Sequence, residues 1–180
     1  TTQLTGGIRY TKDKRKLDGG VHVVTNNVNG PLIPTPGKLS YGEVTYRVAL
    51  RQDVTDNVNV YASFNRGFKA GTYSLQSPAN APVNPQFIDA YEVGVKSELF
   101  GRKLRLNAAA FHYDISGYQI RSAAIDVGAA VLLNAASVRV DGVDVEFEAE
   151  PVEGFRLFGG LTVLDSRFHK FGGPGARYQA

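Results

Sequence analysis

Predicted strands in this sequence are joined by connections that alternate between short and long, and this alternation constrains the fold more than any other feature. Seven segments alternate apolar and polar residues, as β-strands do because successive side chains point to opposite faces. We expect these strands at residues 2–12, 41–51, 57–68, 87–99, 103–116, 138–150 and 155–168. The short connections are 52–56, 100–102 and 151–154. The long ones are 13–40, 69–86 and 117–137.

If consecutive strands are antiparallel neighbours, all short connections lie at one end of the sheet and all long ones at the other. Outer-membrane β-barrels have this layout, with short periplasmic turns and longer extracellular loops. The strands also reach the roughly 9–11 residues that a tilted spanning strand needs. We therefore predict an all-β fold of consecutive antiparallel hairpins that form part of a large transmembrane β-barrel.

The strand at 57–68 shows what the two faces of such a sheet contact. Its even-numbered residues from Val58 to Phe64 are apolar, whereas its odd-numbered residues from Asn59 to Asn65 are polar. In a barrel the apolar face lies against lipid and the polar face lines a wet lumen. A soluble β-sandwich or lipocalin-like barrel, with the apolar face turned inward, is the alternative. Aromatic residues near strand ends fit an interfacial girdle: Tyr10, Tyr91, Phe155 and Phe168.

The register of one hairpin can be predicted from its faces. Matching apolar positions around the turn at 100–102 pairs Leu99 with Leu104. Glu98 then lies opposite Arg105 on the polar face, as a cross-strand ion pair that contributes about 0.2–1 kcal/mol.

The segment 138–150 carries two further features. Val138 and Val140 have the opposite parity to the apolar residues that follow, which predicts a β-bulge at Gly142. The second feature is a row of acidic residues on one face, namely Asp144, Glu146, Glu148 and Glu150. We expect neighbouring Arg or Lys side chains to pair with this row, which is a simpler explanation than a bound cation.

The composition excludes several classes of protein. The chain has 180 residues, a net charge of +3 and no cysteine. Its Lys and Arg residues are scattered among Asp and Glu, so no basic patch indicates nucleic-acid binding. His22, His112 and His169 lack the spacing of metal ligands, and no nucleophile or phosphate-binding motif is present. We therefore expect no enzymatic activity, no cofactor and no metal site.

Three segments between Asn57 and Phe168 carry motifs in a fixed order. They are "VYASFNRGFKAGTY", "FIDAYEVGVKSELFGRKLRLNAAAFHYDISGYQI" and "LLNAASVRVDGVDVEFEAEPVEGFRLFGGLTVLDSRF". In this order and spacing they resemble the C-terminal part of the barrel of TonB-dependent outer-membrane receptors. The sequence starts in the middle of a strand pattern without Met, which we interpret as a piece of a longer protein.

The resemblance implies that residues 1–180 are a fragment of a barrel of about 22 strands, whose N-terminal plug domain is not in this sequence. It further implies a place in the bacterial outer membrane, with outer-membrane lipid against the apolar face. The expected function is uptake of a scarce small molecule such as a ferric siderophore, with energy from the TonB complex acting through the plug region. A passive porin-like channel and a soluble lipocalin-like binding module are the alternatives.

Ligand contacts are expected in the long connections, because binding residues concentrate on loops that a rigid scaffold positions. The candidates are Arg66, Lys69, Tyr73, Gln76, Tyr118, Gln119 and Arg121. Arg66 and Lys69 belong to the segment "RGFKAG", whose glycines also suit a bend at a strand end, so a structural role is the alternative for these two residues.

Overall fold

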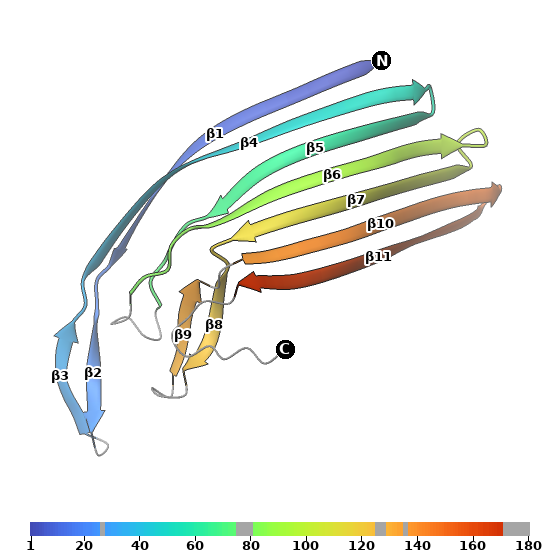
Figure 1. Cartoon of the computed structure of the whole chain (residues 1–180). Helices are drawn as coiled ribbons and strands as arrows, with labels where there is room; N and C mark the ends of the chain where they lie inside the picture. The colour runs from blue at the N-terminus through green and yellow to red at the C-terminus, as the bar shows by residue number, and fades with distance from the viewer. Residues whose placement is uncertain (26–27, 75–80, 125–128, 135–136, 171–180) are drawn as a thin grey trace.

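The computed structural model describes residues 1–25, 28–74, 81–124, 129–134 and 137–170, which form one large antiparallel sheet and two small hairpins (Figure 1). The large sheet consists, in order across the sheet, of β1 (Thr2–Leu17), β4 (Gly37–Thr55), β5 (Val58–Lys69), β6 (Gln86–Leu99), β7 (Leu104–Ser116), β10 (Ser137–Val152) and β11 (Phe155–Lys170). The small hairpins are β2 (Gly20–Thr25) with β3 (Val28–Pro34), and β8 (Gln119–Ala124) with β9 (Ala129–Asn134). The described residues include no helix long and apolar enough to cross a membrane.

The seven strands predicted from the sequence are confirmed as the seven strands of the large sheet. The expectation that residues 13–40 and 117–137 are merely long connections was incomplete, because each contains a small hairpin. Neither hairpin shows a regular alternation of apolar and polar residues: the first contains Asn and Pro, and the second is rich in Ala. Strand pairing satisfies their backbone polar groups even without that alternation.

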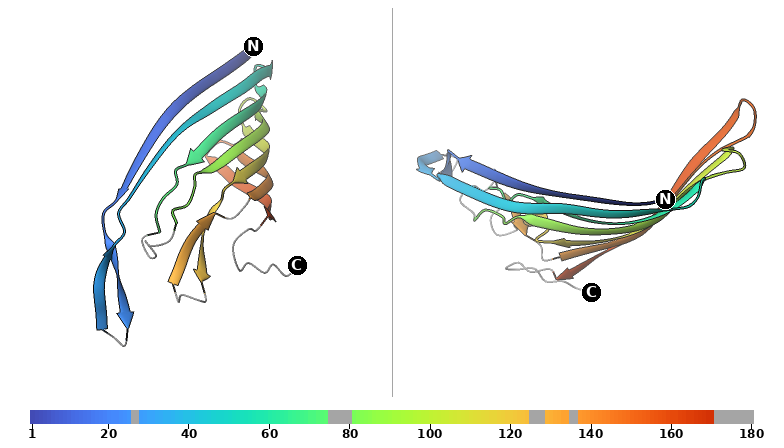
Figure 2. Two further views of the ribbon diagram at one scale, coloured as in Figure 1. Left: turned by 60° about the vertical axis from the view of Figure 1, so that its left-hand side comes forward. Right: turned by 90° about the horizontal axis from the view of Figure 1, so that it is seen from above.

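The connections separate by length as predicted. All short turns lie at one end of the sheet, the turn end, and the small hairpins extend from the other, the loop end (Figure 1). The sheet is curved (Figure 2). Along β4 most residues of the polar face are half-buried, whereas every residue of the apolar face is exposed. The polar face is therefore the concave, inward face, and the apolar face is the convex, outward one.

A belt of apolar side chains crosses the outward face of all seven strands. It runs from Leu4 to Tyr10 in β1 and from Leu157 to Val163 in β11, with apolar residues of the intervening strands between them. These side chains are open to the surroundings: Ile8 is 80% exposed and Leu161 is 65% exposed. Beyond this belt, toward the loop end, charged residues begin on the same face.

The boundary between the belt and the charged residues runs obliquely across the sheet. The hydrogen-bonded row that starts at Ile8 in β1 ends at Arg167 in β11. The first charged outward residue of β1, Lys12, lies four residues to the loop side of this row. In β11 that residue is Asp165, two residues to the turn side. From β1 to β11 the boundary shifts by six residues over six steps between strands, although unevenly, since Arg66, Asp89 and Asp114 all lie on the row itself. The average is about one residue per strand, or about 3.3 Å along the chain for each 4.8 Å between strands. This shift corresponds to a strand tilt of about 35°, as in closed barrels.

Aromatic residues mark the loop side of the belt. Tyr46 lies 5.7 Å from Phe64, and Phe64 lies 4.8 Å from Tyr91, between ring centroids. Tyr10 continues this girdle on β1, where it is 64% exposed. Phe168 does not belong to it, because it pairs with Val138 on the opposite, inward face.

The predicted hairpin register is confirmed. Leu99 pairs with Leu104, and Glu98 lies opposite Arg105 with 3.4 Å between Oε1 and Nη2. Arg105 also reaches Glu148 on β10 at 3.1 Å, and Arg156 on β11 reaches Glu148 at 3.4 Å. The expected pairing of the acidic row with arginines is thus present at Glu148, whereas Asp144 instead accepts a hydrogen bond from the Thr162 hydroxyl. Arg156 extends the pairing to Glu150 at 3.9 Å.

The predicted bulge at Gly142 was wrong. The register runs without a shift through Gly142, which lies opposite Phe111 on β7 and Leu164 on β11. A Cβ at this position would overlap the Phe111 ring, so the glycine makes room for an aromatic side chain of the neighbouring strand. Without a bulge, Val138 stays on the inward face, where it is only 8% exposed.

Candidate functional site

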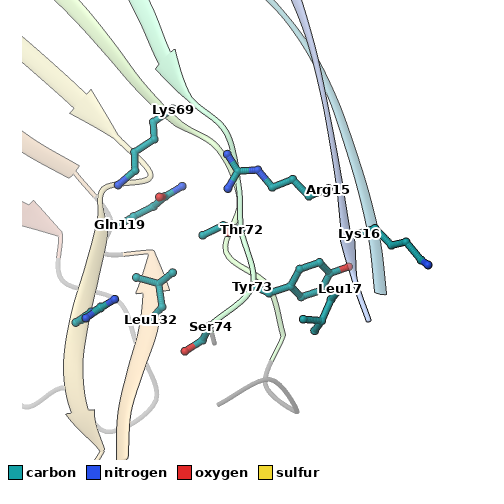
Figure 3. Close-up of a pocket in the computed structure, with 10 residues that line it drawn as sticks. Arg15, Lys16, Leu17, Lys69, Thr72, Tyr73, Ser74, Gln119 and Leu132 are labelled. Atoms are coloured by element: carbon teal, nitrogen blue, oxygen red, sulfur yellow. The ribbon is translucent and has the colours of Figure 1, made fainter. Parts of the chain in front are cut away.

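A cavity of about 660 Å³ lies at the loop end of the sheet, between the end of β1 and the two connections after β5 and β7 (Figure 3). Segments far apart in the sequence supply its wall. The lining residues are Arg15, Lys16, Leu17, Lys69, Thr72, Tyr73, Ser74, Gln119, Arg121 and Leu132. Figure 3 shows Arg15 pointing from β1 toward the connection that carries Thr72, whereas Lys16 points the opposite way.

The cavity is positively charged. Arg15, Lys69 and Arg121 line it, and its described lining residues include no Asp or Glu. Arg15 is the one of these three that has an ion pair among the described residues, at 3.0 Å from Asp13. Opposed cations around a concave space concentrate field lines and attract anions. The site therefore suits a negatively charged ligand.

Buried amide side chains hold the cavity wall together. Gln119, which is 8% exposed, donates from Nε2 to the carbonyls of Ala70 at 3.2 Å and Asn84 at 2.9 Å. Asn134 donates from Nδ2 to the same Asn84 carbonyl at 3.1 Å and to the Gly117 carbonyl at 2.7 Å. These bonds tie the connection after β5 to the β8–β9 hairpin.

The connection after β5 is closed on itself by a short bridge. Thr72 and Val83 exchange backbone hydrogen bonds of 3.2 and 2.9 Å. Gly71 precedes this bridge, and a Cβ there would overlap both the Val83 carbonyl and the Tyr41 hydroxyl. The last glycine of "RGFKAG" therefore permits a close approach of backbone to backbone. This contact supports the structural role considered for that segment.

Four of the seven ligand candidates lie together in this cavity, namely Lys69, Tyr73, Gln119 and Arg121. Gln119 contributes mainly to the wall through its hydrogen bonds. The Tyr73 ring covers Gly37 at the start of β4, where a Cβ would overlap the ring. The assignment of these residues to ligand binding stays a prediction.

The other three candidates lie elsewhere. Arg66 is on the outward face, where it pairs with Asp89 at 2.8 Å and lies 5.1 Å from the Phe87 ring centroid. Tyr118 contacts Phe168 edge to face at 6.2 Å and does not line the cavity. Gln76 lies outside the described residues.

Sequence reasoning missed Arg15, which contributes a cation from a third segment. Its strand was predicted to end at residue 12, although polar and apolar faces continue to differ in burial up to Leu17. The antiparallel register of β1 and β4 continues without a shift beyond residue 12, as far as Lys16 opposite Lys38. Extending the predicted hairpin in this register would have placed Arg15 in a strand.

The histidines show no metal-binding arrangement. His22 Nδ1 lies 2.8 Å from the Gly30 carbonyl, and His112 lies between the carboxylates of Asp114 and Asp141. Within the part of the chain that the structure describes, no group of three or more His, Cys, Asp or Glu residues has the geometry of a metal site.

Comparison with known proteins identifies one family. The model of the family described as TonB-dependent receptor-like β-barrel matches residues 1–178. The chain is 25% identical over 176 residues to the metal-pseudopaline receptor CntO of Pseudomonas aeruginosa, an alignment that covers 91% of this chain and 22% of that receptor. It is 24% identical over 137 residues to the probable TonB-dependent siderophore receptor PiuA of Acinetobacter baumannii, covering 72% and 18% of the two chains.

Solved structures show the same fold. The ferric yersiniabactin uptake receptor FyuA from Yersinia pestis superposes with a TM-score of 0.77 at 22% identity, over 93% of this chain and 24% of that one. The siderophore receptor PiuA from Acinetobacter baumannii superposes with a TM-score of 0.72 at 19% identity, over 95% and 24%. The chain thus spans about a fifth of the length of the curated relatives that it matches.

Proposed function

Since this chain belongs to the TonB-dependent receptor family of transporters and receptors, which are not enzymes, we propose that it is part of an outer-membrane receptor that takes up a ferric siderophore. Barrels of this family lie in the outer membrane. In this proposal the outward belt contacts lipid, the inward face lines the lumen, and TonB supplies the energy for uptake through parts of the receptor outside residues 1–180.

The observation that carries the proposal is the cationic cavity at the loop end. Loops at this end face the cell exterior in outer-membrane barrels, so a cavity there is open to ligands from the medium. Lys69 and Arg121 offer two cations without described carboxylate partners. Charge-assisted hydrogen bonds to such cations are the stronger kind, and they suit the carboxylate or catecholate oxygens of an anionic metal complex.

The outward face supports membrane embedding. The apolar belt is continuous over seven strands, and its boundary tilts as it does in closed barrels. A soluble barrel of the lipocalin type would turn this face inward, whereas here the belt is on the convex side of the sheet. The receptors CntO and PiuA, whose names specify metal-pseudopaline and siderophore, support the choice of ligand class.

Uptake of radioactive iron tests the proposal. The full-length receptor would be expressed in a strain without other siderophore receptors and supplied with ferric catecholate, hydroxamate and carboxylate siderophores in turn. We expect uptake of at least one complex, and loss of that uptake when TonB is deleted. Uptake that continues without TonB would support a passive channel, and no uptake of any complex would contradict the ligand class.

A further inference from the structure

The outward face carries a charged rim just beyond the apolar belt, and the two sides of this rim differ. On the side formed by β5 to β11, basic groups are paired within the protein. Arg66 lies 2.8 Å from Asp89, Arg139 lies 3.2 Å from Asp114, and Arg167 lies 2.6 Å from Asp165. We call this region the paired side.

The side formed by β1 and β4 carries lysines instead. The lysine side consists of Lys12, Lys14, Lys16 and Lys38, all exposed on the outward face. Lys16 pairs with Asp18 at 2.9 Å, whereas Lys12, Lys14 and Lys38 have no ion pair among the described residues. The acidic residues of the same segments, Asp13 and Glu43, belong to the half-buried, inward face.

The strand register brings like charges together on the lysine side. Lys16 lies directly opposite Lys38, and Lys14 lies opposite Ser40. Like charges in directly opposed positions destabilise a strand pair. Lys14, Lys16, Lys38 and Ser40 also line a shallow cavity of about 300 Å³. Asp18 offsets the charge of Lys16 only, so an anion seated between Lys14 and Lys38 would neutralise the two ammonium groups that have no described carboxylate partner, and the Ser40 hydroxyl could donate to it.

The lysine side lies just beyond the apolar belt, at the level of the lipid headgroups, so a lipid headgroup is the anion that it would meet. Lys12 is the next outward residue after Tyr10, the last aromatic side chain of the belt on β1. Lysines at this position keep their alkyl stems along the apolar surface and place the ammonium groups among lipid headgroups. Anionic headgroups attract such basic clusters.

We propose that Lys12, Lys14 and Lys38 bind the phosphate groups of an anionic phosphorylated lipid in the surrounding outer leaflet. This inference rests on the proposed function, since it requires the outward face to lie in a membrane. It adds a second binding site that is separate from the cationic cavity, on the opposite face of the sheet. The paired side does not bind the lipid in the same way, because its own carboxylates already neutralise its arginines.

Lipid retention tests the inference. The full-length receptor would be placed in phosphatidylcholine vesicles containing a small fraction of bis-phosphorylated lipid A, extracted with mild detergent and analysed by native mass spectrometry. The double variant K14Q/K38Q should retain about 25-fold less lipid A, because each lysine near an anionic surface contributes about 1 kcal/mol, or about fivefold. Wild-type retention should fall as the salt concentration rises.

Matched controls separate charge from folding. R102Q/K103Q also removes two positive charges, but from the short turn between β6 and β7 at the other end of the sheet, and should retain lipid A as wild type does. K14R/K38R keeps the charge and should restore retention. Equal retention by K14Q/K38Q and wild type, or equal retention of lipid A and its dephosphorylated form, would overturn the inference.

The outcome also distinguishes this inference from the proposed function. If the wild-type receptor fails to insert into vesicles, the membrane embedding fails and the proposed function fails with it. If it inserts and transports iron but K14Q/K38Q retains lipid A normally, only the inference about the lysine side is wrong.

Discussion

The two ends of the sheet differ in how their charged side chains are paired. At the turn end of the inward face, Arg105 and Arg156 form ion pairs with Glu98, Glu148 and Glu150. At the loop end, Lys69 and Arg121 line a cavity whose described lining residues include no carboxylate. The turn-end residues belong to β6, β7, β10 and β11 of the large sheet, whereas Lys69 is the last residue of β5 and Arg121 belongs to β8 of a small hairpin. At the turn end each arginine bridges neighbouring strands. At the loop end, Lys69 and Arg121 have no carboxylate partner among the described residues.

Under the proposed function, this difference separates the end of the sheet whose charges are paired within the protein from the end whose cations bind a ligand. Paired charges across strands fix the register and contribute modestly to stability. Lys69 and Arg121 repel the other cations of the cavity, and under the proposed function an anionic ligand offsets this repulsion. The outward rim repeats the contrast, with its paired side on β5 to β11 and its lysine side on β1 and β4.

Reversing the charge of the cavity should give the largest effect. K69E/R121E in the full-length receptor would place two carboxylates beside an anionic ligand. We expect the affinity for the transported ferric siderophore to fall on the order of 100-fold or more, since removing or opposing a charge partner in a binding site costs about 2–5 kcal/mol. Equilibrium binding measures it. The turn-end variant R105Q should bind within about twofold of wild type, and equal losses in both variants would remove the contrast between the two ends.

Filling the close approach at Gly71 should give the next largest effect. A Cβ there overlaps the Val83 carbonyl, a backbone atom that cannot move without opening the Thr72–Val83 bridge. We expect G71A to destabilise the folded barrel by about 1–3 kcal/mol, as overpacking does. Thermal unfolding in detergent, followed by circular dichroism, measures the change. G6A is the control, because nothing lies within 4 Å of a Cβ at Gly6; a melting temperature for G71A equal to that of G6A would contradict the prediction.

Removing the amide of Gln119 should cost less. Q119A leaves the Ala70 carbonyl without its donor, but the Asn84 carbonyl keeps a bond from Asn134 at 3.1 Å. One unsatisfied buried acceptor costs about 1–3 kcal/mol, and we expect the lower end of this range. Limited proteolysis of the loop-end connections should accelerate more than global unfolding does. Q3A on β1 serves as the exposed control, and unchanged proteolysis of Q119A would show that the clamp is not needed.

Breaking the ion pairs at the turn end should have the smallest effect. Arg105 is 55% exposed, so its pairs with Glu98 and Glu148 are screened by solvent. We expect R105Q to lower stability by less than about 1 kcal/mol, with no change in ligand binding. A larger loss of stability would mean that the arginine ladder holds the sheet together more firmly than exposed pairs do.

The sequence by itself determined the strands of the large sheet, their faces and the hairpin register between Glu98 and Arg105. These features follow from the period of two and from short turns, which are local properties of the chain. It also placed Lys69, Tyr73, Gln119 and Arg121 in long connections. The same alternation puts Arg66 on the outward face with Phe64, but its ion pair with Asp89 depends on the pairing of β5 with β6, which the sequence did not determine.

Only the tertiary structure decided the remaining features. Gly142 looks like a bulge in the sequence, but it gives space to Phe111 from another strand. Arg15 joins Lys69 and Arg121 because β1 and β4 stay paired beyond their apolar part. The lysine side arises because Lys16 and Lys38, far apart in the chain, meet in register. In each case the deciding contact joins residues distant in sequence, and the alternation within one strand carries no information about such contacts.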